Sequence, residues 1–207
     1  MIERTSLNEI NLILDKNKSW KVLDIGCGYT ANKHANFVAD VQDFSEFYKD
    51  KKKFIKIKDK NLPFKDKEFD FVIASHVIEH VDDFSFFISE LERISNQGYI
   101  ELPTRLGDNL VFENTTDHIW WFIFDDSSKK LIASKRTQTL EPFLSVATGK
   151  KLSDSFRESF VLELFWKNKI DFNLDDKINN KNHEKVNFFT IIKKYLSKRL
   201  RKILSKS

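Results

Sequence analysis

The sequence predicts an α/β fold built on an open, mostly parallel sheet. Five short stretches rich in β-branched or aromatic residues are predicted strands: 21–25, 36–41, 54–58, 69–74 and 99–102. Between the last two, apolar residues recur at three- and four-residue intervals from Phe84 to Ile94, which predicts a crossover helix stopped by Gly98. A helix between two strands implies a right-handed parallel connection, and such strands usually lie in a sheet covered on both faces.

The segments on either side of these strands have patterns of their own. Residues 7–14 have helical spacing, and Ser6 with Glu9 completes a capping box, which predicts a short leading helix. After Pro103, residues 119–124 and 130–136 flank a turn-prone Asp-Asp-Ser-Ser segment and predict a hairpin. We then expect a helix over 155–166, a strand over 169–173 and a polar linker over 175–184.

Composition indicates one globular domain in a reducing compartment. With 207 residues and 41% hydrophobic content, the chain can bury one substantial core, but two independent domains would be cramped. Cys27 is the single cysteine, and the five scattered histidines have no zinc-binding spacing, so we expect neither a disulfide nor a metal site. The first residues lack the layout of a signal peptide and no apolar run has membrane-spanning length, so we expect a cytoplasmic protein.

The first predicted strand runs into a turn with two glycines, Gly26 and Gly28. Glycines let the backbone approach a ligand closely at the carboxyl end of a strand, where open parallel sheets bind their ligands. With Ala31 the turn also satisfies Gly-x-Gly-x-x-Ala, so the glycines alone are compatible with a nicotinamide dinucleotide, another adenosine cofactor, or a tight turn without a ligand.

Two carboxylates narrow this choice. Asp24, two residues before the first glycine, would repel a pyrophosphate and attract a cofactor that carries a sulfonium and an ammonium group. Asp40 ends the second strand, where a carboxylate can accept hydrogen bonds from ribose hydroxyls or simply face water. These positions disfavour a nicotinamide-linked oxidoreductase.

Three segments in order resemble class I S-adenosylmethionine-dependent methyltransferases of the type 11 group. They are Val-Leu-Asp-Ile-Gly-Cys-Gly at 22–28, Leu-Pro-Phe-Lys-Asp-Lys-Glu-Phe-Asp-Phe-Val at 62–72 and Ser-His-Val-Ile-Glu-His-Val at 75–81, followed by Gly-Tyr-Ile-Glu-Leu-Pro at 98–103. The resemblance covers residues 19–103. It implies a Rossmann-like fold with flanking helices and a mostly parallel seven-stranded sheet whose last strand is antiparallel. In this chain, eight residues between Gly28 and Phe37 predict a shortened first crossover.

The resemblance also implies how S-adenosylmethionine would lie across the strand ends. The glycine turn would pass under its methionine and ribose, Asp40 would hold the ribose hydroxyls, and residues 59–62 would edge the adenine. Ser75 and His76 would lie beside the methionine end. The predicted cofactor-binding residues are therefore Asp24, Gly26, Cys27, Gly28, Asp40, Asp59, Leu62, Ser75 and His76.

Methyl transfer needs positioning and exclusion of water, and a general base is added when the acceptor is a hydroxyl or an amine. Two histidines are candidate bases: His80, beside Glu79, and His118, beside Asp117. Each could instead pack or cap locally. Phe112, His118, Trp120 and Trp121 could line the mouth of an acceptor site or belong to the core.

Residues 186–207 contain seven Lys or Arg and no acid, with an apolar stripe at helical spacing. This pattern is typical of a basic amphipathic C-terminal helix on an anionic membrane surface, and it also fits a helix docked on the domain. Nucleic acid is the weakest of the three partners, because no aromatic residues interleave with the charges in the second half of the helix.

We therefore expect one methyltransferase-like domain over 1–180, followed by the basic helix. Residues 19–103 form its cofactor half, and residues 104–180 form its acceptor half. The predicted function is methyl transfer to a small-molecule acceptor or to one linked to a lipid or glycan, in the cytoplasm or peripherally on the inner membrane surface. The alternative, motivated by the short crossover, is a catalytically degenerate relative that acts as a membrane-associated binding partner.

Overall fold

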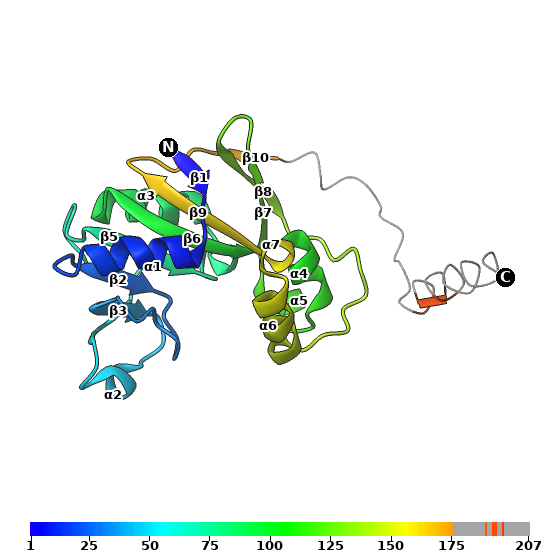
Figure 1. Ribbon diagram of the computed structural model, residues 1–207, viewed down its shortest axis with the longest axis horizontal. Helices are drawn as coiled ribbons and strands as arrows, with labels where there is room; N and C mark the ends of the chain where they lie inside the picture. The colour runs from blue at the N-terminus through cyan, green and yellow to red at the C-terminus, as the bar shows by residue number, and fades with distance from the viewer. Residues whose placement is uncertain (176–188, 190–191, 194–195, 197–207) are drawn as a thin grey trace.

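The computed structural model describes residues 1–175, 189, 192–193 and 196, and within them seven strands form a central sheet in the order β1-β9-β6-β5-β2-β3-β4 (Figure 1). The strands are β1 (Ile2–Arg4), β2 (Val22–Ile25), β3 (Phe37–Asp40), β4 (Lys53–Lys56), β5 (Phe71–Ser75), β6 (Gln97–Pro103) and β9 (Val161–Lys167). The five from β2 to β6 are parallel, and β9 is antiparallel to β6. The predicted α/β fold with a mostly parallel seven-stranded sheet is confirmed.

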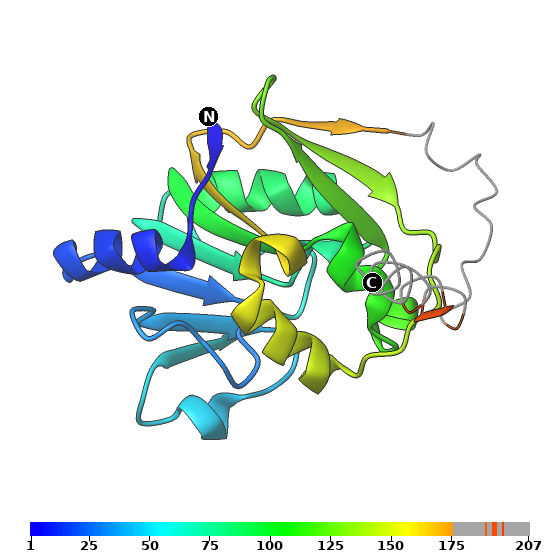
Figure 2. The same ribbon diagram turned by 45° about the vertical axis from the view of Figure 1, so that its right-hand side comes forward.

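Helices cover both faces of this sheet, α1 (Leu7–Lys16) on one and α3 (Phe84–Ile94) on the other, as Figure 2 shows. The two faces hold separate apolar clusters: Ile10 and Leu14 of α1 pack with one set of strand residues, while α3 packs with the other set. Because β2 and β5 are buried along their length, their sequences show apolar runs without alternation.

The predicted capping box at the start of α1 is confirmed, but the predicted stop of α3 at Gly98 is wrong. The capping box of α1 is present: the Ser6 side chain accepts from the Glu9 N–H at 3.2 Å, and Glu9 Oε2 accepts from the Ser6 N–H at 2.8 Å. Gly98 does not stop α3, which ends at Ile94. Gly98 lies in β6, where a Cβ atom would stand 2.3 Å from the Val72 carbonyl oxygen and 2.7 Å from Trp166 Nε1. Close packing explains this glycine.

The predicted helix over 155–166 is wrong. Residues 155–160 complete α6 (Val146–Ser155) and form the single turn α7 (Arg157–Phe160), and the chain then continues as β9. Five of the first six residues of β9 are apolar and almost all are buried, because both faces of the strand are covered. Such a run lacks the two-residue alternation of a half-exposed strand, and periodicity alone cannot distinguish it from a buried helix.

The shortened first crossover is confirmed, because no helix lies between the end of β2 and the start of β3 in these fully described residues. Side chains hold this link in place of helical hydrogen bonds. Lys52 Nζ donates to the carbonyls of Asn32 and Ala35 at 3.0 and 2.5 Å. Asn36 accepts from the Val22 N–H at 2.8 Å and donates to the Trp20 carbonyl at 2.9 Å. Helix α2 (Ser45–Tyr48) follows β3.

The acceptor half adds a second sheet and a group of short helices. The predicted hairpin is confirmed as β7 (Trp120–Asp125) and β8 (Lys130–Lys135), and the strand expected over 169–173 is β10 (Phe172–Leu174), parallel to β8. Helices α4 (Arg105–Leu110) and α5 (Asn114–Asp117) gather with α6 and α7 at one end of the central sheet (Figure 1).

The linker predicted over 175–184 and the basic helix predicted over 186–207 lie almost entirely outside the described residues. Among the residues that are described, no helix is both long and apolar enough to cross a membrane.

Candidate active site

A cavity of about 620 Å³ lies between the glycine turn and the helices of the acceptor half. Its walls come from both halves: Asp24 and the turn on one side, Gly107 of α4, Gly149 of α6 and Arg157 of α7 on the other. Eight predicted site residues line it: Asp24, Gly26, Cys27, Gly28, Ser75, His76, His80 and His118. The volume falls within the range of small-molecule and cofactor sites.

The other three predicted residues do not line this cavity. Asp40 is buried behind the glycine turn, where its Oδ2 accepts from the Gly28 N–H at 3.0 Å and its Oδ1 from the Gln42 N–H at 2.9 Å. Asp59 is exposed. Leu62 packs in the core, and its N–H donates to Glu90 at 2.7 Å. Their roles toward ribose and adenine stay predictions.

The glycine turn presents bare backbone to the cavity. Gly26 has φ +69° and Gly28 has φ +47°, in the left-handed region that side chains disfavour. A Cβ atom at Gly26 would stand 2.3 Å from Val77 Cγ2, whereas at Gly28 it would meet nothing within 4 Å. Tyr48 fixes the turn by donating from its hydroxyl to the Gly28 carbonyl at 2.9 Å. Val77 and Tyr48 therefore hold one side of the turn. The space beside Gly28 is open, so a ligand could approach the backbone there.

Asp24 places a buried carboxylate at the wall of the cavity. Its Oδ2 accepts from the backbone N–H of Asn32 at 2.6 Å, a neutral donor. Burial raises the pKa of Asp24 to about 7, although the Asn32 hydrogen bond and the charge of Lys52 act in the opposite direction. A cation bound in the cavity would stabilise the ionised form of this carboxylate.

His76 joins two acids at the floor of the cavity. Its Nδ1 lies 3.2 Å from Glu79 Oε1, and its Nε2 lies 3.1 Å from Glu101 Oε1. Partial burial lowers the pKa of His76, but Glu101 and Glu79 outweigh it and raise this pKa to about 10. Burial raises the pKa of Glu101, but His76, Tyr99 and Arg157 outweigh it and lower this pKa to about 2. The pair is therefore ionised near neutral pH.

Arg157 and Glu163 extend this network, and neither residue was predicted from the sequence as part of a site. The Arg157 guanidinium contacts Glu101 and lies 3.0 Å from Glu163 Oε1, and the Tyr99 hydroxyl oxygen lies 2.6 Å from Glu101 Oε2 and 2.7 Å from Glu163 Oε1. The two residues belong to α7 and β9, the segment for which the predicted helix is wrong. Glu163 is an acid within an apolar run, in a segment that lies beside a correctly predicted strand. That acid would have been the signal for this network.

His118 is held by a buried aspartate that sequence reasoning missed. Asp108 of α4 is fully buried and contacts His118 Nδ1, while it accepts from Trp121 Nε1 at 2.5 Å and from Arg136 Nε at 2.6 Å. Burial raises the pKa of Asp108, but His118, Trp121 and Arg136 outweigh it and hold this pKa below its ordinary value. These partners are 10 to 28 residues away, and no local pattern links them.

Of the four residues considered for the acceptor mouth, His118 lines the cavity, and Phe112, Trp120 and Trp121 do not. Trp120 and Trp121 are buried, and the Trp120 Nε1–H donates to the Val81 carbonyl at 3.0 Å. Phe112 is exposed. The core interpretation of the two tryptophans is confirmed.

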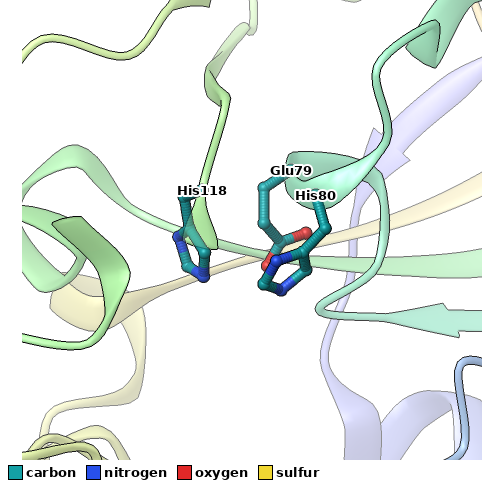
Figure 3. Close-up of side chains that lie close together, drawn as sticks. All are labelled: Glu79, His80 and His118. Carbon is teal, nitrogen blue, oxygen red and sulfur yellow. The ribbon is translucent and has the colours of Figure 1, made fainter. Parts of the chain in front are cut away.

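His80 and His118 lie against each other at the cavity wall, and Figure 3 shows Glu79 reaching the same point. The two imidazole rings are 4.5 Å apart at 89°, and His80 Nδ1 lies 2.9 Å from the Asp117 carbonyl oxygen. Glu79 and His80 come from the 3-10 helix η1 (Ile78–His80), and His118 directly follows α5. The sequence predicted no metal site, yet the fold assembles three residues of ligand type.

The family model described as a methyltransferase domain matches residues 23–100. No curated protein matches the sequence.

Similar solved structures include the YcgJ protein from Bacillus subtilis, with 20% identity over 48% of this chain and 52% of that chain and a TM-score of 0.38. The PH0226 protein from Pyrococcus horikoshii OT3 has 14% identity over 78% and 88%, with a TM-score of 0.44. An S-adenosylmethionine-dependent methyltransferase from Mesorhizobium loti has 9% identity over 77% and 96%, with a TM-score of 0.42. This chain spans about half the length of YcgJ. The family match covers residues 23–100, which contain the glycine turn and η1, and it supports the predicted resemblance to class I methyltransferases over that segment.

Proposed function

We propose that this chain transfers a methyl group from S-adenosylmethionine to a small-molecule acceptor or to one linked to a lipid or glycan. One observation carries the proposal: a single cavity is lined by the glycine turn of the family-matched segment and by His118 of the acceptor half. A cofactor and an acceptor could therefore meet in one cavity, as direct transfer requires.

The cavity has features that fit the cofactor. S-adenosylmethionine supplies a methyl group on a positively charged sulfur and carries an ammonium group nearby. Asp24 offers a buried carboxylate whose ionised form a cation would stabilise, and the bare backbone at Gly28 leaves space for close approach. The first crossover has no helix, so no helix N-terminus contributes to cofactor binding there. The backbone and carboxylate contacts would have to provide that binding instead.

The acceptor half supplies a candidate proton acceptor. The partner of His118 Nδ1 is the Asp108 carboxylate, so Nδ1 carries the proton and donates it, and Nε2 keeps a free lone pair. A histidine oriented in this way can accept a proton from a hydroxyl or amine acceptor. His80, whose Nδ1 faces the Asp117 carbonyl, is the second candidate.

Calorimetric titration with S-adenosylmethionine and S-adenosylhomocysteine tests the proposal. We expect binding of both ligands, and Asp24→Asn should weaken S-adenosylmethionine more than its uncharged-sulfur product, because only the former has the sulfonium. Asp50→Asn is the matched control, since Asp50 is an exposed acid outside the cavity.

Two results would count against the proposal. Absence of binding to either ligand would favour the degenerate binding partner, which the helix-free crossover already motivates. Normal cofactor binding with unchanged turnover in His118→Asn would remove His118 as the base.

The membrane part of the proposal concerns residues 186–207. A lipid- or glycan-linked acceptor would be reached at a membrane surface if this basic segment binds anionic lipid. Flotation with anionic vesicles should recover the full chain and not a chain cut after Glu184. Equal recovery of the two would rule out a membrane role for the segment.

A further inference from the structure

We propose that Glu79, His80 and His118 form a binding site for a divalent transition-metal ion, such as Zn²⁺, in the wall of the cavity. Each residue offers one ligand atom, and the three atoms lie within 4.8 Å of one another. Figure 3 shows the three side chains converging from two separate segments of the chain. Two imidazoles and a carboxylate are a ligand set that zinc and iron(II) prefer in proteins.

The hydrogen bonds of the two histidines engage one ring nitrogen of each and leave the other available. His80 Nδ1 faces the backbone carbonyl of Asp117 at 2.9 Å, and His118 Nδ1 contacts the Asp108 carboxylate. Both partners are acceptors, so both Nδ1 atoms carry a proton and both Nε2 atoms keep their lone pairs. Metal-binding histidines usually donate their other ring N–H to a carboxylate or carbonyl, which orients the ring.

The burial of the Glu79 carboxylate supports the metal site independently of the histidines. Its side chain is fully buried, and Oε1 lies 3.2 Å from His76 Nδ1. Oε2 is buried and has no hydrogen-bond partner within the part of the chain that the structure describes. A buried carboxylate oxygen without a partner is energetically costly and rare in folded proteins. A metal ion between Glu79 and the two imidazoles would provide that partner.

The backbone keeps the two ligand-bearing segments together. The Ile119 N–H donates to the Glu79 carbonyl at 2.8 Å, which joins η1 to the start of β7. The His80 contact with Asp117 adds a second link beside it. Ligand atoms on a tetrahedral zinc ion stand about 3.3 Å apart, so the side chains would need to close by at most about 1.5 Å.

The position of the site indicates what it would do. Three protein ligands leave a coordination position for water or another oxygen, as in catalytic zinc sites. His80 and His118 line the cavity, so that position would be reached from it. On the proposed function, this favours an acceptor with a hydroxyl or carboxylate oxygen that can bind the metal. His118 Nε2 would then hold the ion and could not also accept a proton.

The test is titration of the metal-stripped full chain with Zn²⁺ by calorimetry and with Co²⁺ by visible absorption. We expect one ion per chain and the strong visible bands of low-coordinate cobalt. His80→Gln and His118→Asn should each weaken binding by at least about tenfold. His80 is exposed, so its substitution should leave the fold intact, which circular dichroism would check.

His34→Gln is the matched control, because His34 lies outside both the cluster and the cavity lining. It should bind the ion as wild type does. No saturable binding to the wild-type chain would overturn the proposal, and so would equal binding by wild type and His80→Gln. Cofactor binding is titrated separately without metal, so failure of the methyltransferase proposal would leave the metal result readable.

Discussion

The cofactor half and the acceptor half meet at one cavity, but they hold their polar groups differently. In the cofactor half, side chains fix the backbone: Asp40 and Tyr48 hold the glycine turn, and Lys52 holds the link that replaces a helix. In the acceptor half, a side chain fixes other side chains: Asp108 binds a histidine, a tryptophan and an arginine at once. Substitutions should therefore act mainly on ligand binding in the first half and on stability in the second.

The largest expected effect is that of Asp108→Asn. The substitution leaves the Arg136 guanidinium, whose side chain is 5% exposed, without its carboxylate. Breaking a buried ion pair on one side costs about 3 to 5 kcal/mol, so we expect a loss of that size in the free energy of unfolding. Urea denaturation measures it. Asp117→Asn, at an exposed acid of the following helix α5, should unfold close to wild type, and an equal loss there would contradict the central role of Asp108.

A smaller loss is expected for Lys52→Met. The ammonium group donates to three carbonyls between β2 and β3, of Asn32, Lys33 and Ala35. Losing these charge-assisted bonds should cost about 1 to 3 kcal/mol, below the effect of Asp108→Asn. It should also weaken cofactor binding, because the Asn32 N–H holds Asp24. Lys51→Met, at an exposed lysine next to Lys52, is the control for the free energy of unfolding and should stay close to wild type. Wild-type cofactor affinity in the Lys52 variant would show that the link between β2 and β3 does not support the site.

The smallest expected effect is a pH dependence set by Asp24. Because the pKa of this carboxyl is raised to about 7, its charged fraction increases as the pH rises through neutrality. Affinity for the cationic cofactor should therefore rise several-fold between about pH 6 and pH 7.5. Calorimetry at a series of pH values measures this. In Asp24→Asn the rise should disappear, and a rise of the same size in that variant would assign the titration to another group.

The difference between the cofactor half and the acceptor half also explains which features could be predicted from the sequence. Asp24, Gly26 and Gly28 stand together in one strand and turn, so a local pattern specifies their position and chemistry. The Asp108 cluster joins residues that only the tertiary fold brings together, and its members have no common period. The same holds for Glu79 and His118, whose convergence depends on how η1 meets the start of β7.

The errors in the sheet have a similar cause. The antiparallel strand β9 was predicted as a helix, because burial on both faces removes the alternation that marks a strand. The strand β1 was not predicted, because three residues give too short a pattern to recognise. Strands followed by well-marked turns or helices were found at nearly the right positions.

The position of β1 has a consequence for how the protein folds. Residues Ile2 to Arg4 pair with Trp166 to Leu164, so the edge of the central sheet joins two segments about 160 residues apart in the chain. Until β9 is in place, β6 has an unpaired edge and β1 has no partner. Contacts of such long sequence separation slow folding and leave strand edges available for wrong pairings. During synthesis, β1 emerges from the ribosome well before its partner β9, so it should be among the last strands to join the sheet.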